Sequence, residues 1–179
     1  MNVQTGFDQR DRLESRERLV VIGNGMAGCR AVEEILALQP DRYAIPIFGA
    51  EPRVNYNRHM LSPVLAGEKT FDEIVINSAE WYDEHGITLI SGDPVIHIDR
   101  EACQVVSRGG KIESYDKLLI ATGSDPFVIP VPGKDLPGVV TFRDLDDVET
   151  MLSAAQTNTK AVVIGGGLLG LEAAHGLSL

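Results

Sequence analysis

Three glycines near the start of the chain have the spacing of a turn that binds phosphate. Gly23, Gly25 and Gly28 directly follow the apolar residues 19–22, which predict a buried strand. Gly23 permits a sharp turn, Gly25 offers no side chain to obstruct a pyrophosphate, and Gly28 lets the next helix pack on the sheet. The N–H groups and the dipole at the start of that helix attract phosphate oxygens. The spacing therefore predicts a dinucleotide-binding turn, with a purely geometric glycine turn as the alternative.

A carboxylate stands where such a turn needs a partner for the adenosine ribose. Glu51 lies 23 residues after Gly28, at the end of the next predicted strand. An acid about 20 residues beyond the turn accepts hydrogen bonds from the ribose hydroxyls. A solvated surface acid is the alternative interpretation of Glu51.

The glycine pattern occurs a second time near the end of the sequence. Gly165, Gly167 and Gly170 follow the apolar residues 161–164, and 142 residues separate Gly165 from Gly23. The acid of this second motif is expected at about residue 190, beyond the last residue given. Two such motifs predict two dinucleotide cofactors that exchange electrons.

The elements that must position the first motif form a βαβ unit. The pattern predicts strands over residues 19–22 and 43–48, with a helix over residues 27–38 between them. A short helix over residues 79–85 and a strand over residues 87–90 follow a long loop. This alternation is typical of a parallel sheet with helices packed on it.

The pattern changes to short strands after residue 94. Residues 95–98, 103–107 and 111–114 are separated by turn residues and predict an antiparallel meander. Residues 117–121 return to the pattern of a buried strand. A proline-rich, extended connection follows.

A second helix–turn–strand region closes the sequence. Asp144 is placed to cap a helix over residues 145–155, and residues 161–164 predict the strand that opens a second βα unit. The predicted fold is therefore α/β: a Rossmann-like domain with a central parallel sheet and a small antiparallel meander, followed by the start of a second Rossmann-like domain.

Composition excludes several classes of protein. The 179 residues carry a net charge of −10, which disfavours nucleic acid and anionic membranes as partners. No apolar run reaches the roughly 18 residues of a membrane span. Cys29 and Cys103 form no metal-ligand cluster, and the histidines lack metal-ligand spacing, so we expect no metal site. These features predict a cytoplasmic protein.

Five segments together resemble the FAD- and NAD(P)H-dependent reductases of the pyridine nucleotide–disulfide oxidoreductase superfamily. They are VVIGNGMAG, FGAEPRVNYNRHMLSPVLAGE, YDKLLIATGSDPFVIPVPG, LPGVVTFRDLDDVE and VVIGGGLLGLEAA. The resemblance covers residues 18–179. Within the superfamily, YNRHMLSPVLAGEKTFDEI and EWYDEHGITL are most similar to the N-terminal part of the large subunit of assimilatory NAD(P)H nitrite reductases.

The resemblance implies two sets of cofactor-binding residues and leaves the catalytic residues unknown. The set implied for FAD is Gly23, Gly25, Gly28, Glu51, Arg58, Val95, Ala121, Thr122, Gly123 and Arg143. The set implied for the NAD(P)H side is Gly165, Gly167, Gly170 and Glu172.

Several of these residues also have a simpler interpretation. Arg58 pairs with phosphate or is solvated, and Val95 lies near the adenine or is an ordinary strand residue. The segment formed by Ala121, Thr122 and Gly123 closes over the FAD phosphates or makes a plain turn. Arg143 lies near the flavin or pairs with Asp146 or Asp147. Glu172 lies near the nicotinamide or charges the first turn of its helix.

The resemblance also implies the organisation and activity of the protein. We expect a flexible leader over residues 1–17, an FAD domain over residues 18–156 and the first βα unit of an NAD(P)H domain over residues 157–179. The chain is expected to be the N-terminal fragment of a longer reductase that passes electrons from NAD(P)H through FAD to a separate acceptor domain or protein.

Three functions remain open at this point. In a nitrite reductase, sirohaem and an iron–sulfur cluster would lie beyond the sequence given. A ferredoxin or rubredoxin reductase shares nearly all of these motifs. A non-catalytic FAD-binding module is the alternative from another class.

Overall fold

The computed structural model describes residues 16–158 and 160–178, and internal packing divides them into two units. The first unit comprises the described residues up to 55 together with residues 77–123. The second comprises residues 56–76 and those from 124 onward. Most of the predicted leader lies outside the described residues, and the predicted domain boundaries stay a prediction.

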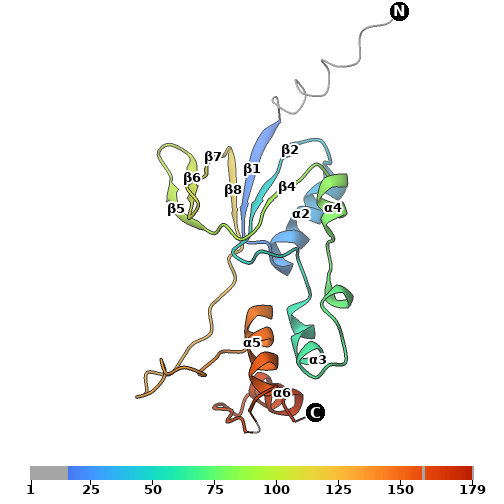
Figure 1. Cartoon of the computed structure of the whole chain (residues 1–179). Helices are drawn as coiled ribbons and strands as arrows, with labels where there is room; N and C mark the ends of the chain where they lie inside the picture. The colour runs from blue at the N-terminus through green and yellow to red at the C-terminus, as the bar shows by residue number, and fades with distance from the viewer. Residues whose placement is uncertain (1–15, 159, 179) are drawn as a thin grey trace, which may run out of the picture. The chain divides into compact units, whose positions relative to one another are not determined.

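Strand β1 (Glu17–Ile22) is the centre of the parallel sheet in the first unit (Figure 1). It pairs in parallel with β8 (Lys117–Ile120) on one side and with β3 (Pro46–Phe48) on the other. Strand β4 (Thr88–Ile90) continues the sheet beyond β3, also in parallel. Just before β8, Asp116 Oδ2 accepts a hydrogen bond of 2.6 Å from the Arg18 backbone N–H, which fixes the register of the two strands.

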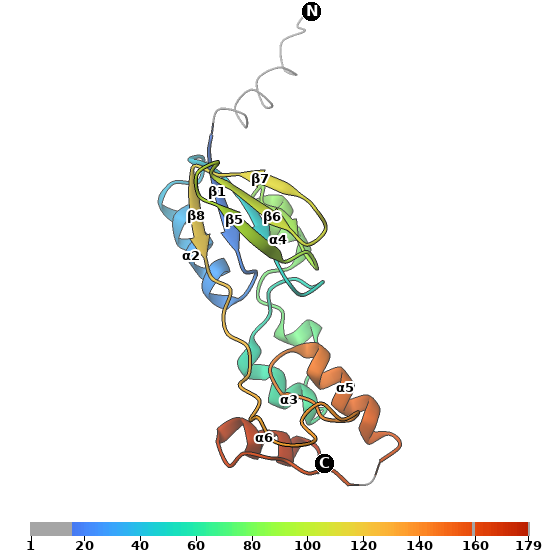
Figure 2. The ribbon, with the colours of Figure 1, turned by 90° about the vertical axis from the view of Figure 1, so that its left-hand side faces the viewer.

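Both faces of this sheet are covered, as the continuous apolar run of β1 predicts. Helices α2 (Met26–Leu38) and α4 (Ala79–Glu84) lie on one face, where Val21 packs in a core with Val32. The opposite face packs on an antiparallel sheet, and there Val20 meets Val105. Figures 1 and 2 show the two coverings on opposite sides of β1.

The antiparallel sheet is the predicted meander. It consists of β5 (Val95–Asp99), β6 (Gln104–Ser107) and β7 (Ile112–Ser114) in sequential order. The turn between β5 and β6 is held by the Asp99 carboxylate, which accepts from the backbone N–H groups of residues 101 and 102.

The second unit is built from helices and turns. Its helices are α3 (Leu61–Leu65), α5 (Leu145–Ala155) and α6 (Leu168–Gly176), with 3-10 turns at Arg58–Met60 and Asp72–Ile74. They share one apolar core, and Figure 2 shows the three helices grouped together. The buried members of this core are Tyr56, Leu61, Val64, Leu65, Ile74, Leu145, Val148, Met151 and Ala173.

Two predicted strands differ from the structure. Residues 43–48 form two short strands, β2 (Tyr43–Ala44) and β3, because Pro46 has no N–H to continue the ladder. The prediction of a buried strand over residues 161–164 is wrong. Val162 is 88% exposed and Ile164 is 78% exposed, and no strand of the described residues pairs with them. An apolar run becomes a strand only where a neighbour accepts its hydrogen bonds.

The predicted cap of α5 is confirmed. Asp144 Oδ1 accepts from the Asp147 N–H at 2.9 Å, and the Asp147 carboxylate accepts in return from the Asp144 N–H. We expect Asp144→Ala to lower the free energy of unfolding of the second unit by about 1 kcal/mol, because the start of α5 loses its acceptor. Urea denaturation followed by helical circular dichroism measures this. Asp144→Asn keeps an acceptor oxygen and should cost little; equal losses in the two variants would contradict the capping role.

Candidate functional site

The turn after β1 is shaped by a close approach of two backbone segments. Gly23 has φ of +114°, and a Cβ atom on it would lie 2.1 Å from the carbonyl oxygen of Ala121, at the end of β8. Its N–H donates to the carbonyl of Phe48, at the end of β3, at 2.8 Å. The turn therefore lies at the carboxyl ends of three adjacent parallel strands, the edge at which α/β sheets bind ligands.

Gly28 makes the second close approach. A Cβ atom on this residue would lie 2.4 Å from the carbonyl oxygen of Gly23, so the first turn of α2 packs directly on the glycine turn. Any larger residue would push the helix away from the strand. The structure thus gives Gly23 and Gly28 the packing roles predicted from their spacing.

Gly25 faces open space instead. It is the N-cap of α2, with extended backbone (φ −96°, ψ −179°), and apart from its chain neighbours no heavy atom of the described residues lies within 4 Å of a Cβ built on it. No described side chain caps the helix, and its first turn holds no acid. The free N–H groups and the positive end of the helix dipole are therefore available to an anion. This cradle fits the pyrophosphate of a dinucleotide.

Glu51 lies at the same edge of the sheet as the glycine turn. It follows β3, and its carbonyl accepts from the Gly92 N–H at 2.9 Å. Within the same loop, a Cβ atom on Gly49 would lie 3.0 Å from the Cβ of Asn24, so this loop packs against the glycine turn. Glu51 is half-buried. Its role as the ribose acceptor stays a prediction.

The other first-unit residues implied for FAD lie close to these elements. Ala121 packs against the glycine turn, Thr122 follows it, and Gly123 adopts φ of +75° as the chain turns. Val95 opens β5 and packs on the core that contains Val20 and Phe48. The structure thus brings the strand-end segment to the turn, and it places Val95 in a strand.

Arg58 and Arg143 are neighbours within the second unit. The Arg58 Nη1 donates to the carbonyl of Arg143 at 3.1 Å, and its guanidinium lies 5.4 Å from the ring centre of Tyr56. Arg143 donates through its side chain to the carbonyl and the hydroxyl of Ser124. Its backbone N–H, rather than its guanidinium, donates to Asp147 at 2.7 Å.

The second glycine motif repeats part of the local geometry of the first; unlike Gly23, Gly165 has no heavy atom of the described residues, apart from its chain neighbours, within 4 Å of a Cβ built on it. Gly165 has φ of +128°, and a Cβ atom on Gly170 would lie 2.0 Å from the Gly165 carbonyl oxygen. Gly167 is the N-cap of α6, extended at φ −77° and ψ 175°, with the same open surroundings as Gly25. The turn forms although the strand predicted before it does not.

Glu172 does not charge the first turn of α6, which holds no acid. Its carboxylate instead accepts a hydrogen bond of 2.6 Å from the hydroxyl of Ser62, on α3. The helix-charge interpretation of Glu172 is therefore wrong. Nothing in the spacing of the two residues, 110 positions apart, indicated this contact.

A buried polar cluster behind the glycine turn was not predicted at all. The Asn24 Oδ1 accepts from the Tyr82 hydroxyl at 2.8 Å and from the Cys29 thiol at 3.3 Å. Burial raises the pKa of Cys29 to about 11, and it also raises the pKa of Tyr82. The raised pKa values favour the neutral form of both side chains, which hydrogen-bond to Asn24 as neutral groups.

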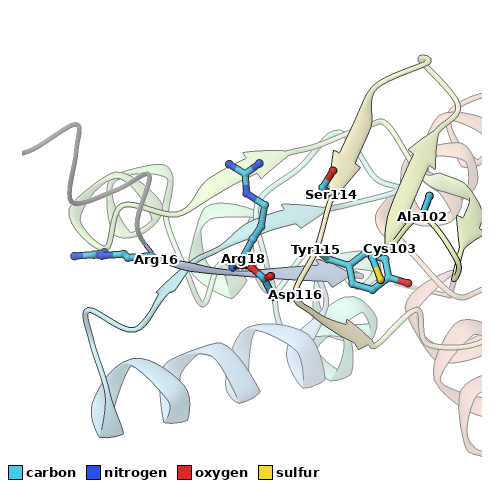
Figure 3. Close-up of a pocket in the computed structure, with 7 residues that line it drawn as sticks. All are labelled: Arg16, Arg18, Ala102, Cys103, Ser114, Tyr115 and Asp116. Atoms are coloured by element: carbon cyan, nitrogen blue, oxygen red, sulfur yellow. Dashed lines mark hydrogen bonds between the residues drawn. The ribbon is translucent and has the colours of Figure 1, made fainter.

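A shallow hollow of about 280 Å³ elsewhere in the first unit is no competing site (Figure 3). It lies beside Arg16 and Arg18, at the amino-terminal end of β1, away from the edge at which parallel sheets bind ligands. Both arginines already form ion pairs, with Asp41 and Glu113 respectively. Within residues 16–158 and 160–178, no group of three or more metal-ligating side chains comes together, and no helix is long and apolar enough to cross a membrane.

The comparisons with known proteins agree with this geometry. The family model described as pyridine nucleotide-disulphide oxidoreductase matches residues 17–178. The chain is 52% identical over 162 residues to the assimilatory nitrate reductase electron transfer subunit of Bacillus subtilis, and 51% identical over 162 residues to the nitrite reductase [NAD(P)H] of the same organism. Each match covers 90% of this chain, but only 21% and 20% of those proteins. The chain thus spans about a fifth of these relatives.

A solved structure has the same fold. The NADH:rubredoxin oxidoreductase from Clostridium acetobutylicum superposes with a TM-score of 0.82 at 29% identity. The match covers 92% of this chain and 42% of that one. The α/β fold with a parallel and a small antiparallel sheet, predicted from the sequence, is thereby confirmed.

The two cysteines should differ sharply in reactivity. Cys103 is exposed, whereas Cys29 is 1% exposed and its raised pKa disfavours the reactive thiolate. With a disulfide reagent at mildly alkaline pH, we expect one fast thiol in the native chain and a second only after denaturation, because only Cys103 is accessible to the reagent. Cys103→Ser should abolish the fast reaction. Two fast thiols in the native wild type would show that the cluster around Cys29 opens readily.

Proposed function

Because the chain belongs to the pyridine nucleotide-disulphide oxidoreductase family, we propose that it binds FAD at its first glycine motif and accepts electrons from NAD(P)H. The observation that supports this best is the open cradle at Gly25, between the two crowded positions Gly23 and Gly28. A turn built only for packing has no need of open space at its middle glycine. A pyrophosphate that approaches the backbone does need it.

The proposal assigns the FAD contacts of the first unit by chemistry. The N–H groups at the start of α2 hold the pyrophosphate, the Glu51 carboxylate accepts from the ribose hydroxyls, and Gly123 permits close approach of the strand-end segment. Val95 is assigned to the adenine. In the second unit, Arg58 and Arg143 supply guanidinium groups suited to phosphate or to the flavin.

The NAD(P)H contacts are assigned to the second motif. Gly165 shares the positive φ of Gly23, Gly170 makes the same close approach as Gly28, and Gly167 is an uncapped helix start like Gly25. Glu172, held by Ser62, is assigned to the region where the nicotinamide meets the flavin. A bound flavin supplies the chemistry of hydride acceptance and onward electron transfer. The residues of the chain bind and orient the two cofactors.

Similarity to the two Bacillus subtilis proteins favours a role in nitrate or nitrite assimilation, with a downstream domain or protein as acceptor. If nitrite is the final acceptor, we place the sirohaem and the iron–sulfur cluster outside these 179 residues. The match to a rubredoxin oxidoreductase supports the second candidate, a reductase of a small electron carrier. The two free cysteines are consistent with the reducing cytoplasm.

FAD should bind more tightly than FMN, because FMN lacks the adenosine assigned to Glu51. We expect Gly25→Ala to fold normally, since its backbone is extended and its surroundings are open, and to weaken FAD binding at least tenfold by filling the cradle. Flavin fluorescence titration measures both. Gly167→Ala is a matched control, because Gly167 is also an extended N-cap glycine with open surroundings, but it belongs to the second motif. Equal affinity for FAD and FMN, or equal effects of the two variants, would reject the assignment.

Electron transfer can be tested by bleaching of the bound flavin. We expect NADH or NADPH to reduce FAD on the wild-type chain far more slowly than on a longer chain that carries the whole second domain, and Gly167→Ala to slow this reduction further while FAD affinity is unchanged. Stopped-flow absorbance under anaerobic conditions gives the rates, and dithionite serves as a reductant that needs no binding site. If FAD binds but neither nucleotide reduces it, the chain is a non-catalytic FAD-binding module.

A further inference from the structure

The hydroxyl of Tyr82 connects the two loops to which cofactor contacts are assigned. It donates to Asn24 Oδ1 at 2.8 Å, within the glycine turn, and it accepts from the backbone N–H of Asn55 at 3.3 Å. Asn55 ends the loop that carries Glu51. Tyr82 itself lies on α4 and is 2% exposed.

Asn24 links the same two loops directly. Its Nδ2 donates to the carbonyl of Arg53 at 3.2 Å, so the amide both receives the tyrosine hydroxyl and binds the loop after β3. The side chain therefore points into the unit, although Asn24 stands between two glycines of the phosphate turn. Gly49 leaves room for this arrangement, because a Cβ there would lie 3.0 Å from the Asn24 Cβ, a tight contact.

The hydrogen-bonded cluster continues from Asn55 to helix α2. The Asn55 Nδ2 donates to Asn77 Oδ1 at 2.7 Å, and the Asn77 Nδ2 donates to Glu33 Oε1 at 2.9 Å. Glu33 lies on the helix whose start forms the cradle. Asn55 and Asn77 are each 2% exposed, so water does not replace these bonds at low cost.

We propose that Tyr82 is a positioning residue for the dinucleotide: its hydroxyl sets the distance between the phosphate turn at Gly25 and the ribose acceptor Glu51. A pyrophosphate and a ribose of one ligand are a fixed length apart, so both contacts form together only if the two loops keep their spacing. This inference rests on the proposed function, and it assigns a role to α4, which holds no residue of the predicted site.

The test compares two substitutions in the same core. Tyr82→Phe removes the hydroxyl and keeps the ring, whereas Ile87→Val trims a buried residue of the same apolar cluster without touching a polar contact. Both should lower the melting temperature by a few degrees. We expect Tyr82→Phe to weaken FAD binding about three- to tenfold, as loss of one hydrogen bond allows, with a smaller effect on FMN. Ile87→Val should leave FAD affinity within about twofold.

Hydrogen exchange of the apo chain provides a readout that does not depend on FAD. Amides of residues 23–26 and 49–55 should exchange faster in Tyr82→Phe but not in Ile87→Val, with β6 amides as an internal reference. A double variant with Asn24→Ala should lose less FAD affinity than the product of the single losses, because the hydroxyl acts partly through Asn24.

The outcomes separate this inference from the proposed function. If the wild type binds FAD but Tyr82→Phe and Ile87→Val lose affinity alike, Tyr82 is merely structural and the inference is overturned. If the wild type binds no FAD, the proposed function fails. In that case, unchanged hydrogen exchange of the loop amides in Tyr82→Phe would also refute the link between the two loops. Faster hydrogen exchange of these amides would support the link.

Discussion

The first unit depends on how closely three backbone segments approach each other at the end of β1. Gly23 meets the carbonyl of Ala121, and Gly28 meets the carbonyl of Gly23, at distances that no Cβ atom tolerates. These approaches place the start of α2 against the carboxyl edge of the sheet. These close approaches, together with the hydrogen bonds of Asn24 behind the turn, hold the open position at Gly25 in place.

Much of the fold follows from local patterns in the sequence. The apolar run of β1 predicts a strand buried on both faces, and Asp144 predicts the start of α5, because both signals act over a few residues. The same reasoning fails at residues 161–164. Their apolar side chains favour burial, but a strand also needs hydrogen-bond partners, and those come from elsewhere in a chain. Periodicity does not report whether such partners are present.

The candidate site, like the fold, is predictable from the sequence where its signals are local, and it is not where its contacts join distant residues. Glycine spacing identifies the turn, and the distance to Glu51 identifies the adjacent loop, since a dinucleotide-binding unit has a nearly constant length. The contacts that hold these loops are not local: Tyr82 reaches Asn24 across 58 positions, and Ser62 reaches Glu172 across 110. Asparagine, tyrosine and serine occur in many surroundings, so these residue types alone do not predict the contacts that they form. Only the folded chain shows which of them meet.

The pairing of β1 with β8 has a consequence for synthesis of the protein. Arg18 and its partner Asp116 are 98 residues apart, so the central strand waits for its second neighbour while that length is translated, about 5–20 s at ordinary elongation rates. During this interval the edge of β1 that later meets β8 presents unpaired N–H and C=O groups, the kind of edge that recruits strands from other chains. A nascent chain of this protein therefore keeps an unpaired strand edge until residue 120 emerges, and slower translation would lengthen that interval.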